Sequence, residues 1–261
     1  MIDLWVRGVG LWTPGFPGAE AWCSGRSSEA AEAPEAKLLE GAIRRRATGQ
    51  TRMAVEVLQQ AASDAGCDLS SVPTVWATAH GEHETAVGIL EMMQCGEGRL
   101  SPTRFHNSVY NTASGYASIA TGNRAPSTTV SSGRELVAVA LLEAHGLLQA
   151  GAQDVIAVFA DEPMLPPFDA RGAGAPLALA LCLSRDQAGA AARLSGLRRE
   201  RAQPVPLHPR FGGLYVSAAL PLLESVVAQR EGRISLELDL GEDGPIWTLR
   251  LDPAHHGPGA R

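Results

Sequence analysis

Segments with strand-like and helix-like patterns alternate along this chain of 261 residues, and this alternation is what most restricts its fold. Apolar runs at 4–11, 74–79 and 154–160 predict strands. Apolar residues at helical spacing over 50–65 and 134–150 predict helices. Strands that alternate with helices indicate a parallel or mixed sheet covered by helices on both faces. The sequence therefore predicts an α/β fold.

The rest of the chain continues this pattern. Its expected elements are a helix over 84–94, a turn at 101–105, a helix that contains Asn111 and Ala120, a strand at 127–130, strands at 176–184 and 191–199, a helix over 214–229, and strands near 233–240 and 246–252. Apolar residues make up 45% of the chain and charged residues 19%, which is typical of a globular protein. We expect one domain over 1–252 and a disordered tail over 253–261.

Charge and cysteine content restrict the partners and the location. The net charge of −6 argues against a nucleic-acid partner, because such binding needs a basic face. No apolar stretch reaches the ~18 residues of a membrane span, and the N-terminus lacks a signal-peptide pattern. The four cysteines, Cys23, Cys67, Cys95 and Cys182, are far apart in sequence and form no CxxC pair. We therefore expect reduced thiols in a cytoplasmic protein that does not enter a membrane.

No cofactor or metal is expected from the motifs. His80 and His83 have no third ligand beside them and are typical of a polar loop. The histidines at 255–256 fall in the expected tail. The glycines of the GVG sequence at 8–10 are followed by Thr13-Pro14 instead of a helix start, so they are not a dinucleotide fingerprint.

Two charged motifs are interpreted as structural. Asp161 and Glu162 end an expected strand just before a proline, where solvated turn residues are common. The basic run at 44–46 is interpreted as a solvated loop face. The alternative for this run is that it steers an acidic carrier protein or a partner enzyme.

Four segments, in this order, resemble the β-ketoacyl synthase family. Residues 6–14 have the sequence VRGVGLWTP and resemble its opening strand and turn. Residues 101–115 resemble its segment leading into an interface helix. Residues 127–140, STTVSSGRELVAVA, resemble the strand, nucleophile elbow and buried helix, and 150–158, AGAQDVIAV, resemble the next strand.

This resemblance covers roughly residues 1–185. It implies a thiolase-like layered α/β/α fold, with 1–185 as the half similar to the ketosynthase N-terminal domain. Residues 186–252 would then form a shortened second half.

The elbow of this chain departs from the family pattern. Active members carry a nucleophilic cysteine there, and counting back from the apolar run 136–138 places Ser132 at that position, to within one residue. The family's "HGTGT"-like histidine motif is missing as well. A serine nucleophile would need an adjacent base, and only His80, His83 and His106 are expected in segments that could approach it. We interpret Ser132 as an N-cap of the following helix.

The resemblance implies a non-catalytic subunit, a chain-length factor, that pairs with an active β-ketoacyl synthase. Such a subunit meets acyl carrier protein indirectly, and short members of this kind resemble those of aryl-polyene pigment pathways. The expected interface consists of the helix and strand beside the elbow. Its expected residues are Asn107, Asn111, Ala113, Gly115, Ala117, Ser127, Val130 and Ser131.

Two alternatives stay open at this point. The first is an acyltransferase or hydrolase that uses Ser132, although Val130 stands where a GxSxG motif has its first glycine. The second is a structural homodimer. No catalytic residue, cofactor or metal is expected in the favoured interpretation.

Overall fold

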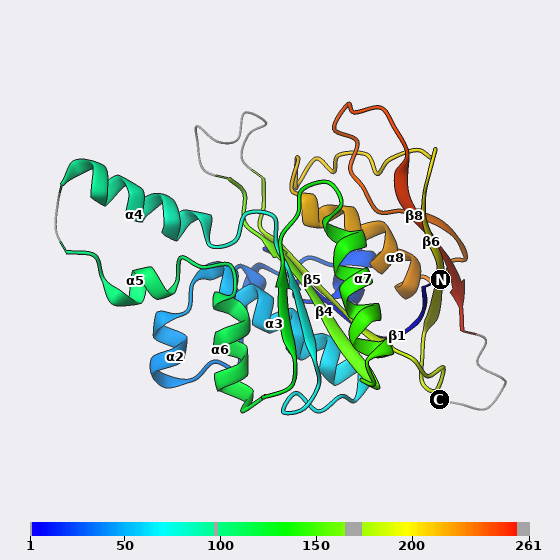
Figure 1. Ribbon diagram of the computed structural model, residues 1–261, viewed down its shortest axis with the longest axis horizontal. Coiled ribbons are helices and arrows are strands. Elements are labelled where there is room, and N and C mark those ends of the chain that lie inside the picture. The colour runs from blue at the N-terminus through cyan, green and yellow to red at the C-terminus, as the bar shows by residue number, and fades with distance from the viewer. Residues whose placement is uncertain (1, 97–98, 165–173, 255–261) are drawn as a thin grey trace.

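The computed structural model describes residues 2–96, 99–164 and 174–254. Eight strands form one sheet in the order β3-β2-β4-β5-β1-β6-β8-β7 (Figure 1). The strands are β1 (Asp3–Trp12), β2 (Thr74–Ala77), β3 (Ser127–Val130), β4 (Asp154–Asp161), β5 (Leu177–Ser184), β6 (Ala192–Glu200), β7 (Gly232–Ser235) and β8 (Ile246–Pro253). The helices are α1 (Ala19–Cys23), α2 (Gly41–Arg46), α3 (Gly49–Ala65), α4 (His83–Cys95), α5 (Pro102–His106), α6 (Thr112–Thr121), α7 (Leu136–Gln149) and α8 (Leu220–Val227), with 3-10 turns at Glu29–Ala31 and Tyr215–Ala219.

The sheet is mixed, as the sequence predicts. Strands β3, β2 and β4 run parallel to one another. The pairs β4–β5, β5–β1, β1–β6, β6–β8 and β8–β7 are antiparallel. Strand β3 is one edge of the sheet and β7 is the other.

The side chains of strand β5 pack against both helix layers. Its residues alternate between the two faces of the sheet. Leu177, Leu179, Leu181 and Leu183 belong to the core that contains α7 and α8. The small residues between them, such as Ala180 and Cys182, belong to the second core, which contains α3 and α6. Helices cover both faces, so the layered α/β/α fold is confirmed.

Helix α3 lies unusually close to β1. A Cβ atom on Gly8 would stand 2.4 Å from the carbonyl oxygen of Ala61, and one on Gly10 would stand 2.4 Å from that of Val57. A real Cβ atom does not come this close to a backbone atom, so a side chain at either glycine would push the helix off the strand. The glycines that resemble the family's opening strand therefore set the spacing between sheet and helix.

Four expected elements differ in the structure. The strand expected near 233–240 is shorter, because β7 ends at Ser235. Residues 101–105 are not a simple turn, because Pro102 begins α5 and the Ser101 hydroxyl caps it by accepting from the Arg104 amide. The expected helix 214–229 is a 3-10 turn followed by the shorter α8. The helix expected from residue 134 begins two residues later, at Leu136.

The C-terminal boundary also needs a correction. Pro253 belongs to β8, and the Ala254 amide donates to the Ala191 carbonyl at 2.9 Å. The disordered tail predicted to start at 253 is therefore wrong for these two residues, which complete the pairing with β6. Residues 255–261, with the two tail histidines, lie outside the described residues.

The strands from residues 186–252 extend the same sheet as those from residues 1–185. The division into a ketosynthase-like half and a shortened half stays a prediction. In the described part of the chain, no helix combines the length and the apolar character that a bilayer span requires.

Candidate functional site

The elbow is the segment between β3 and α7. It comprises residues 131–135, and the Leu136 amide donates to the Gly133 carbonyl at 3.1 Å in a turn before the helix. The N-cap of α7 is Glu135, whose side chain makes no capping hydrogen bond. The interpretation of Ser132 as the N-cap is therefore wrong, because this extra turn separates Ser132 from the helix.

The two elbow serines have different surroundings. Ser131 is exposed, and its hydroxyl donates to the Ala79 carbonyl at 3.4 Å. Ser132 is half-buried. Among the described residues, no side chain or backbone group forms a hydrogen bond with the Ser132 hydroxyl. Within this part of the chain, no general base makes the contact that would activate a serine nucleophile.

Arg134 fixes the elbow to the second half of the chain. Its Nε lies 2.6 Å from an oxygen of Glu237, and its Nη1 lies 3.0 Å from Glu242. Glu237 is fully buried, and its other oxygen accepts from the Trp247 amide at 2.7 Å. A buried charge that is paired and hydrogen-bonded in this way holds its neighbours in one arrangement. The sequence does not reveal this contact, because Arg134 and Glu237 are 103 positions apart.

The three candidate histidines are placed differently. The His80 ring lies 5.9 Å from the ring of Tyr215, and Tyr215 in turn stands 3.6 Å from where a Gly133 Cβ would be. His80 therefore approaches the elbow across Tyr215. His83 is buried, and its Nε2 lies 3.0 Å from the Pro163 carbonyl oxygen.

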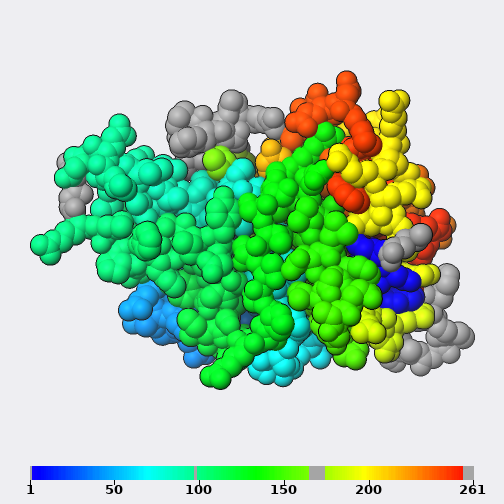
Figure 2. Space-filling model, in the orientation of Figure 1, coloured from blue at the N-terminus to red at the C-terminus, as the bar shows by residue number. Residues whose placement is uncertain are grey.

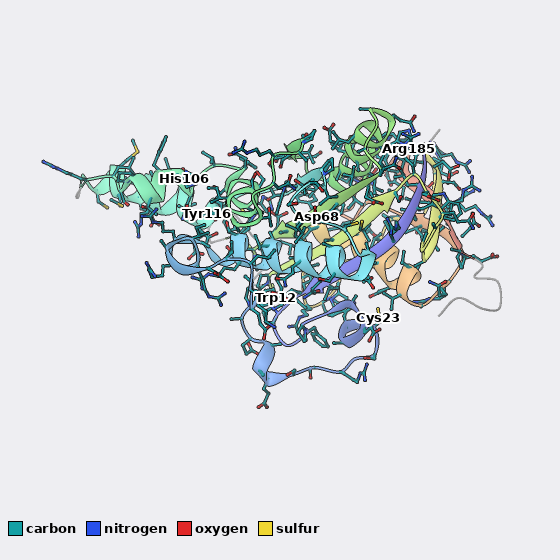
Figure 3. All side chains as sticks on the ribbon, turned by 90° about the horizontal axis from the view of Figure 1, so that it is seen from below. Trp12, Cys23, Asp68, His106, Tyr116 and Arg185 are labelled. Carbon is teal, nitrogen blue, oxygen red and sulfur yellow. The ribbon has the colours of Figure 1, made fainter. Side chains whose placement is uncertain are left out.

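His106 contacts α6 and, among the described residues, not the elbow. Its ring packs edge-on against Tyr116 with centroids 5.5 Å apart, and Figure 3 shows the two residues together at the α5–α6 end. Of the three histidines expected near the elbow, the described contacts place one beside it.

Asp161 holds the loop that carries His80. It is fully buried at the end of β4, and its carboxylate accepts from the Thr78 hydroxyl at 2.5 Å and from the amides of Ala79 at 2.9 Å and His80 at 3.2 Å. The expectation of a solvated turn residue is wrong, although the expected structural role holds. Burial raises the pKa of Asp161 to about 7, against the opposing effect of the three donated hydrogen bonds.

The hydrogen bonds of Thr78 extend this arrangement. The Thr78 oxygen accepts from the Gly81 amide at 2.8 Å and from the Gln50 side chain at 3.2 Å. Gly81 has φ +58°, and the Tyr110 ring lies 3.0 Å from the position that its Cβ would take. Only glycine combines this backbone conformation with so close a ring. The loop is thus built by β2, β4 and α3 together.

Two further carboxylates lie near the start of α3. Glu82 is buried, and one of its oxygens accepts from the hydroxyls of Thr48 and Thr51, both at 2.8 Å. Glu162 lies against Gly49, the first residue of that helix. Burial first, and then repulsion from Glu84, Glu82 and Asp161, raise the pKa of Glu162 to about 7.

A Glu162→Gln variant is expected to change how stability depends on pH. The folded pKa of about 7 lies above the ordinary value of 4.5, so the stability that protonated Glu162 contributes is fully present below pH 4.5 and is lost as the pH rises through 7. Between pH 4.5 and pH 8, the free energy of unfolding of the variant should therefore rise by about 2 kcal/mol relative to that of the natural protein. Urea unfolding at both pH values measures this gain. Glu231→Gln, at an exposed position, is the matched control and should show no such gain. Parallel pH dependence in the natural protein and Glu162→Gln would rule the expectation out.

The proposed interface residues fall into two groups. Ser127, Val130 and Ser131 lie on or just after the edge strand β3. Of the helix residues, Asn111 is exposed, and Ala113 and Gly115 are half-buried.

The other two, Asn107 and Ala117, are buried within the chain. The Asn107 amide donates to the Arg46 carbonyl at 2.7 Å, and its oxygen accepts from the Tyr116 hydroxyl at 2.9 Å. These two residues support the surface from beneath. Arg46 belongs to the basic run, whose side chains are exposed as expected, although the run lies in helix α2 and not in a loop.

Sequence separation misled the prediction for two of the cysteines. Cys67 and Cys182 lie side by side, with 3.3 Å between their sulfur atoms, and both are close to Asp154. Cys23 and Cys95 are exposed and free. Because Asp154 begins β4 and the elbow follows the end of the parallel strand β3, the Cys67–Cys182 pair lies at the opposite end of the sheet from Ser132.

Comparison with known proteins gives a family and a fold. The family model described as beta-ketoacyl synthase, N-terminal domain, matches residues 20–208. A chain of the structure of a ketosynthase (ApeO) in complex with its chain length factor (ApeC) from Xenorhabdus doucetiae is similar with a TM-score of 0.70 at 20% identity, and the match covers 97% of this chain and 100% of that one. A chain of the ishigamide ketosynthase/chain length factor is similar with a TM-score of 0.73 at 12% identity, over 97% and 100%.

A longer protein matches less completely. A beta-ketoacyl synthase from Burkholderia phymatum STM815 is similar with a TM-score of 0.55 at 16% identity, over 86% of this chain and 70% of that one. No curated protein matches this sequence significantly. The structural similarities establish the ketosynthase type of fold.

Proposed function

From the premise that this chain belongs to the β-ketoacyl synthase family, we propose that it is a non-catalytic member, a chain-length factor that works only beside an active β-ketoacyl synthase. One observation carries the proposal: the segment that resembles the nucleophile elbow holds Ser131 and Ser132 and no cysteine, whereas active members carry out thiolate chemistry there. Condensation needs a thiolate that accepts the acyl chain, and a serine supplies none.

The remaining groups of the site do not replace the missing chemistry. Within the described residues, no base contacts the Ser132 hydroxyl, and the thiol pair Cys67–Cys182 lies at the other end of the sheet. His83 is engaged by a backbone carbonyl, and His106 packs on Tyr116. The alternative of a Ser132-dependent hydrolase therefore has no geometric support among these residues.

The open edge of β3 supports a partner that resembles this chain. The amides of Thr74 in β2 and of Thr78, just after it, donate to the carbonyls of residues 126 and 130, so the even-numbered residues of β3 face β2. The N–H and C=O groups of Ser127 and Thr129 then point away from the sheet. An exposed strand edge of this kind is a template for pairing with a further strand. We propose that the corresponding strand of an active ketosynthase occupies it.

Exposed apolar side chains extend the same surface. Five large ones lie on or near α4, α5 and α6: Leu90, Met93, Phe105, Tyr110 and Ile119, which are between 50% and 71% exposed. Figure 2 shows segments 80–150 in cyan and green spread over the face in view. Monomeric proteins rarely expose so much apolar surface in one region. We propose that the partner ketosynthase covers this surface together with the β3 edge.

The proposed partner indicates the substrate, and the cysteines indicate the location. The proposed complex extends acyl chains that acyl carrier protein delivers to the synthase subunit, and this subunit limits their length. Matched structures that are as short as this chain include ketosynthase–chain length factor complexes, which favours polyketide or aryl-polyene products. A cytoplasmic location fits the four free thiols.

Co-expression with a cysteine-bearing ketosynthase encoded beside this gene tests the proposal. We expect the two chains to purify together as a one-to-one complex, because each alone would leave its strand edge and apolar surface open. Size-exclusion chromatography with mass determination measures the assembly, and product analysis measures chain length. A stable homodimer that ignores the synthase would favour the structural alternative instead.

A further inference from the structure

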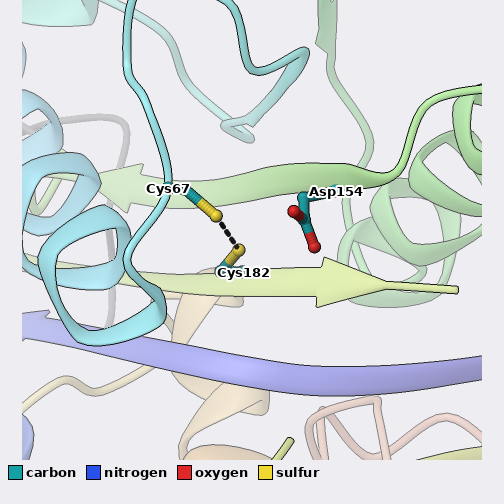
Figure 4. Close-up of side chains that lie close together, drawn as sticks. All are labelled: Cys67, Asp154 and Cys182. Atoms are coloured by element: carbon teal, nitrogen blue, oxygen red, sulfur yellow. Dashed lines mark hydrogen bonds between the residues drawn. The ribbon is translucent and has the colours of Figure 1, made fainter. Parts of the chain in front are cut away.

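Two thiols far apart in sequence meet where α3 ends on the sheet. Cys67 follows Gly66, the left-handed C-cap of α3, and its amide donates to the Ala62 carbonyl at 2.9 Å. Cys182 lies near the C-terminal end of β5, an interior strand of the sheet. Their sulfur atoms are 3.3 Å apart, as Figure 4 shows, although 115 positions separate the two residues in the chain.

The two thiols differ in access to solvent. Cys182 is fully buried, whereas Cys67 is half-buried. A small reagent therefore reaches Cys67 first, and Cys182 is reached only through Cys67. Cys67 lies just after the C-cap of α3, whereas Cys182 is held by the strand pairing of β5.

Charged groups surround the pair in a fixed arrangement. Arg7 lies at a bulge of β1, between Val6 and Gly8. Its Nη1 lies 3.0 Å from each oxygen of Asp154, and its Nη2 donates to the Ala65 carbonyl at 3.2 Å. This ion pair joins β1, β4 and the last turn of α3 around the two sulfur atoms.

The hydrogen bond between the thiols makes them chemically unequal. It lowers the pKa of Cys67 and, with burial, raises the pKa of Cys182. Cys67 is thus the thiol that ionises, because this hydrogen bond outweighs the opposing effects of burial and of the Asp154 carboxylate on its pKa. The accessible sulfur is also the better nucleophile.

We propose that Cys67 and Cys182 form a reversible dithiol–disulfide pair, a modification site for low-molecular-weight disulfides such as glutathione disulfide. This inference does not depend on the proposed function. In the first step, the Cys67 thiolate attacks one sulfur of glutathione disulfide, forms a mixed disulfide and releases a glutathione thiolate. In the second, Cys182 loses its proton to solvent and attacks the Cys67 sulfur, which releases the second glutathione. The protein loses two electrons and two protons, and the glutathione disulfide becomes two glutathione thiols.

A disulfide suits this geometry better than a metal ion. The two sulfurs need to approach from 3.3 Å to about 2.05 Å. Two thiolates on a tetrahedral zinc ion would instead stand about 3.8 Å apart. Asp154, the third potential ligand, is already paired with Arg7 through both of its oxygens.

Disulfide mapping tests the proposal on the full chain. The protein is incubated with glutathione disulfide, quenched with acid, blocked with N-ethylmaleimide, digested and analysed by mass spectrometry. We expect a linked pair of peptides that contain Cys67 and Cys182, which dithiothreitol separates. Closing a loop of this length should raise the melting temperature on the order of 5 °C or more. A Cys23→Ser/Cys95→Ser protein removes the two exposed thiols without touching the pair.

Single substitutions test the order of the two steps. In Cys182→Ala, the reaction should stop at a stable glutathione adduct on Cys67. In Cys67→Ser, Cys182 should stay unmodified while the protein is folded. The absence of the linked peptides in the unsubstituted protein would overturn the proposal whether or not the variants fold. Glutathione on Cys182 in folded Cys67→Ser, or zinc binding by the reduced protein that blocks both thiols and is reversed by EDTA, would also overturn it.

Discussion

A Thr129→Pro variant is expected to bind the partner ketosynthase about a hundredfold more weakly than the natural chain. Thr129 lies at the centre of β3, and its N–H points away from the sheet. Proline removes that N–H and adds a ring at the edge where the partner strand would pair. A lost hydrogen bond that leaves a buried carbonyl unsatisfied costs about 3 kcal/mol, which corresponds to about two decades in Kd.

The substitution spares the pairing inside the subunit. Strand β2 forms its hydrogen bonds with the even-numbered residues of β3, and proline at position 129 removes none of them. The thermal unfolding of the free chain should therefore change little. Thr129→Val retains the N–H and the β-branched shape, and it should bind like the natural chain. Isothermal titration with the purified synthase, or co-purification yield where the free subunits are unstable, measures the difference. Natural affinity in Thr129→Pro would place the interface elsewhere.

Replacing Asp161 by alanine is expected to lower the free energy of unfolding by roughly 3–5 kcal/mol. The change leaves the Thr78 hydroxyl and the amides of Ala79 and His80 without their buried acceptor. Each unsatisfied buried donor costs about 1–3 kcal/mol. The loop that carries His80 past the elbow would lose its anchor on β4.

Asp161→Asn is the matched control for this substitution. Its side-chain oxygen can replace the carboxylate oxygen that accepts from the Thr78 hydroxyl and the His80 amide, while its amino group faces the Ala79 amide. We therefore expect about half of the loss. Urea unfolding gives both values, and hydrogen exchange of the Ala79 and His80 amides reports the loop directly. Equal stability in Asp161→Ala and the natural protein would show that this anchor is dispensable.

Most of the fold was predictable because it depends on local patterns. Apolar spacing predicted α3 and the long strands, and the glycines of β1 indicated the opening strand of the family. The capping of α5 by Ser101 was also readable from the Ser-Pro pair, but the expectation was a turn. The start of α7 was misplaced because the turn at Gly133 has no apolar signal of its own.

The site was less predictable because long-range contacts build it. Asp161 resembles a solvated turn residue in the sequence, yet β2 and β4 bury it between them. Arg134 forms an ion pair with Glu237, which lies far from it in the sequence. Cys67 and Cys182 looked unrelated because sheet topology, and not sequence spacing, brings their two elements together. The serine hydroxyl at the elbow was the part of the site that could be predicted from the sequence by itself.

The central claim is that this subunit takes no covalent part in condensation. The most direct test is intact-mass analysis after incubation with acyl-loaded carrier protein, for this chain alone and for its complex with the synthase. We expect an acyl adduct on the synthase cysteine in the complex and no adduct on this chain in either sample. An acyl group on this chain that disappears in Ser132→Ala would contradict the account.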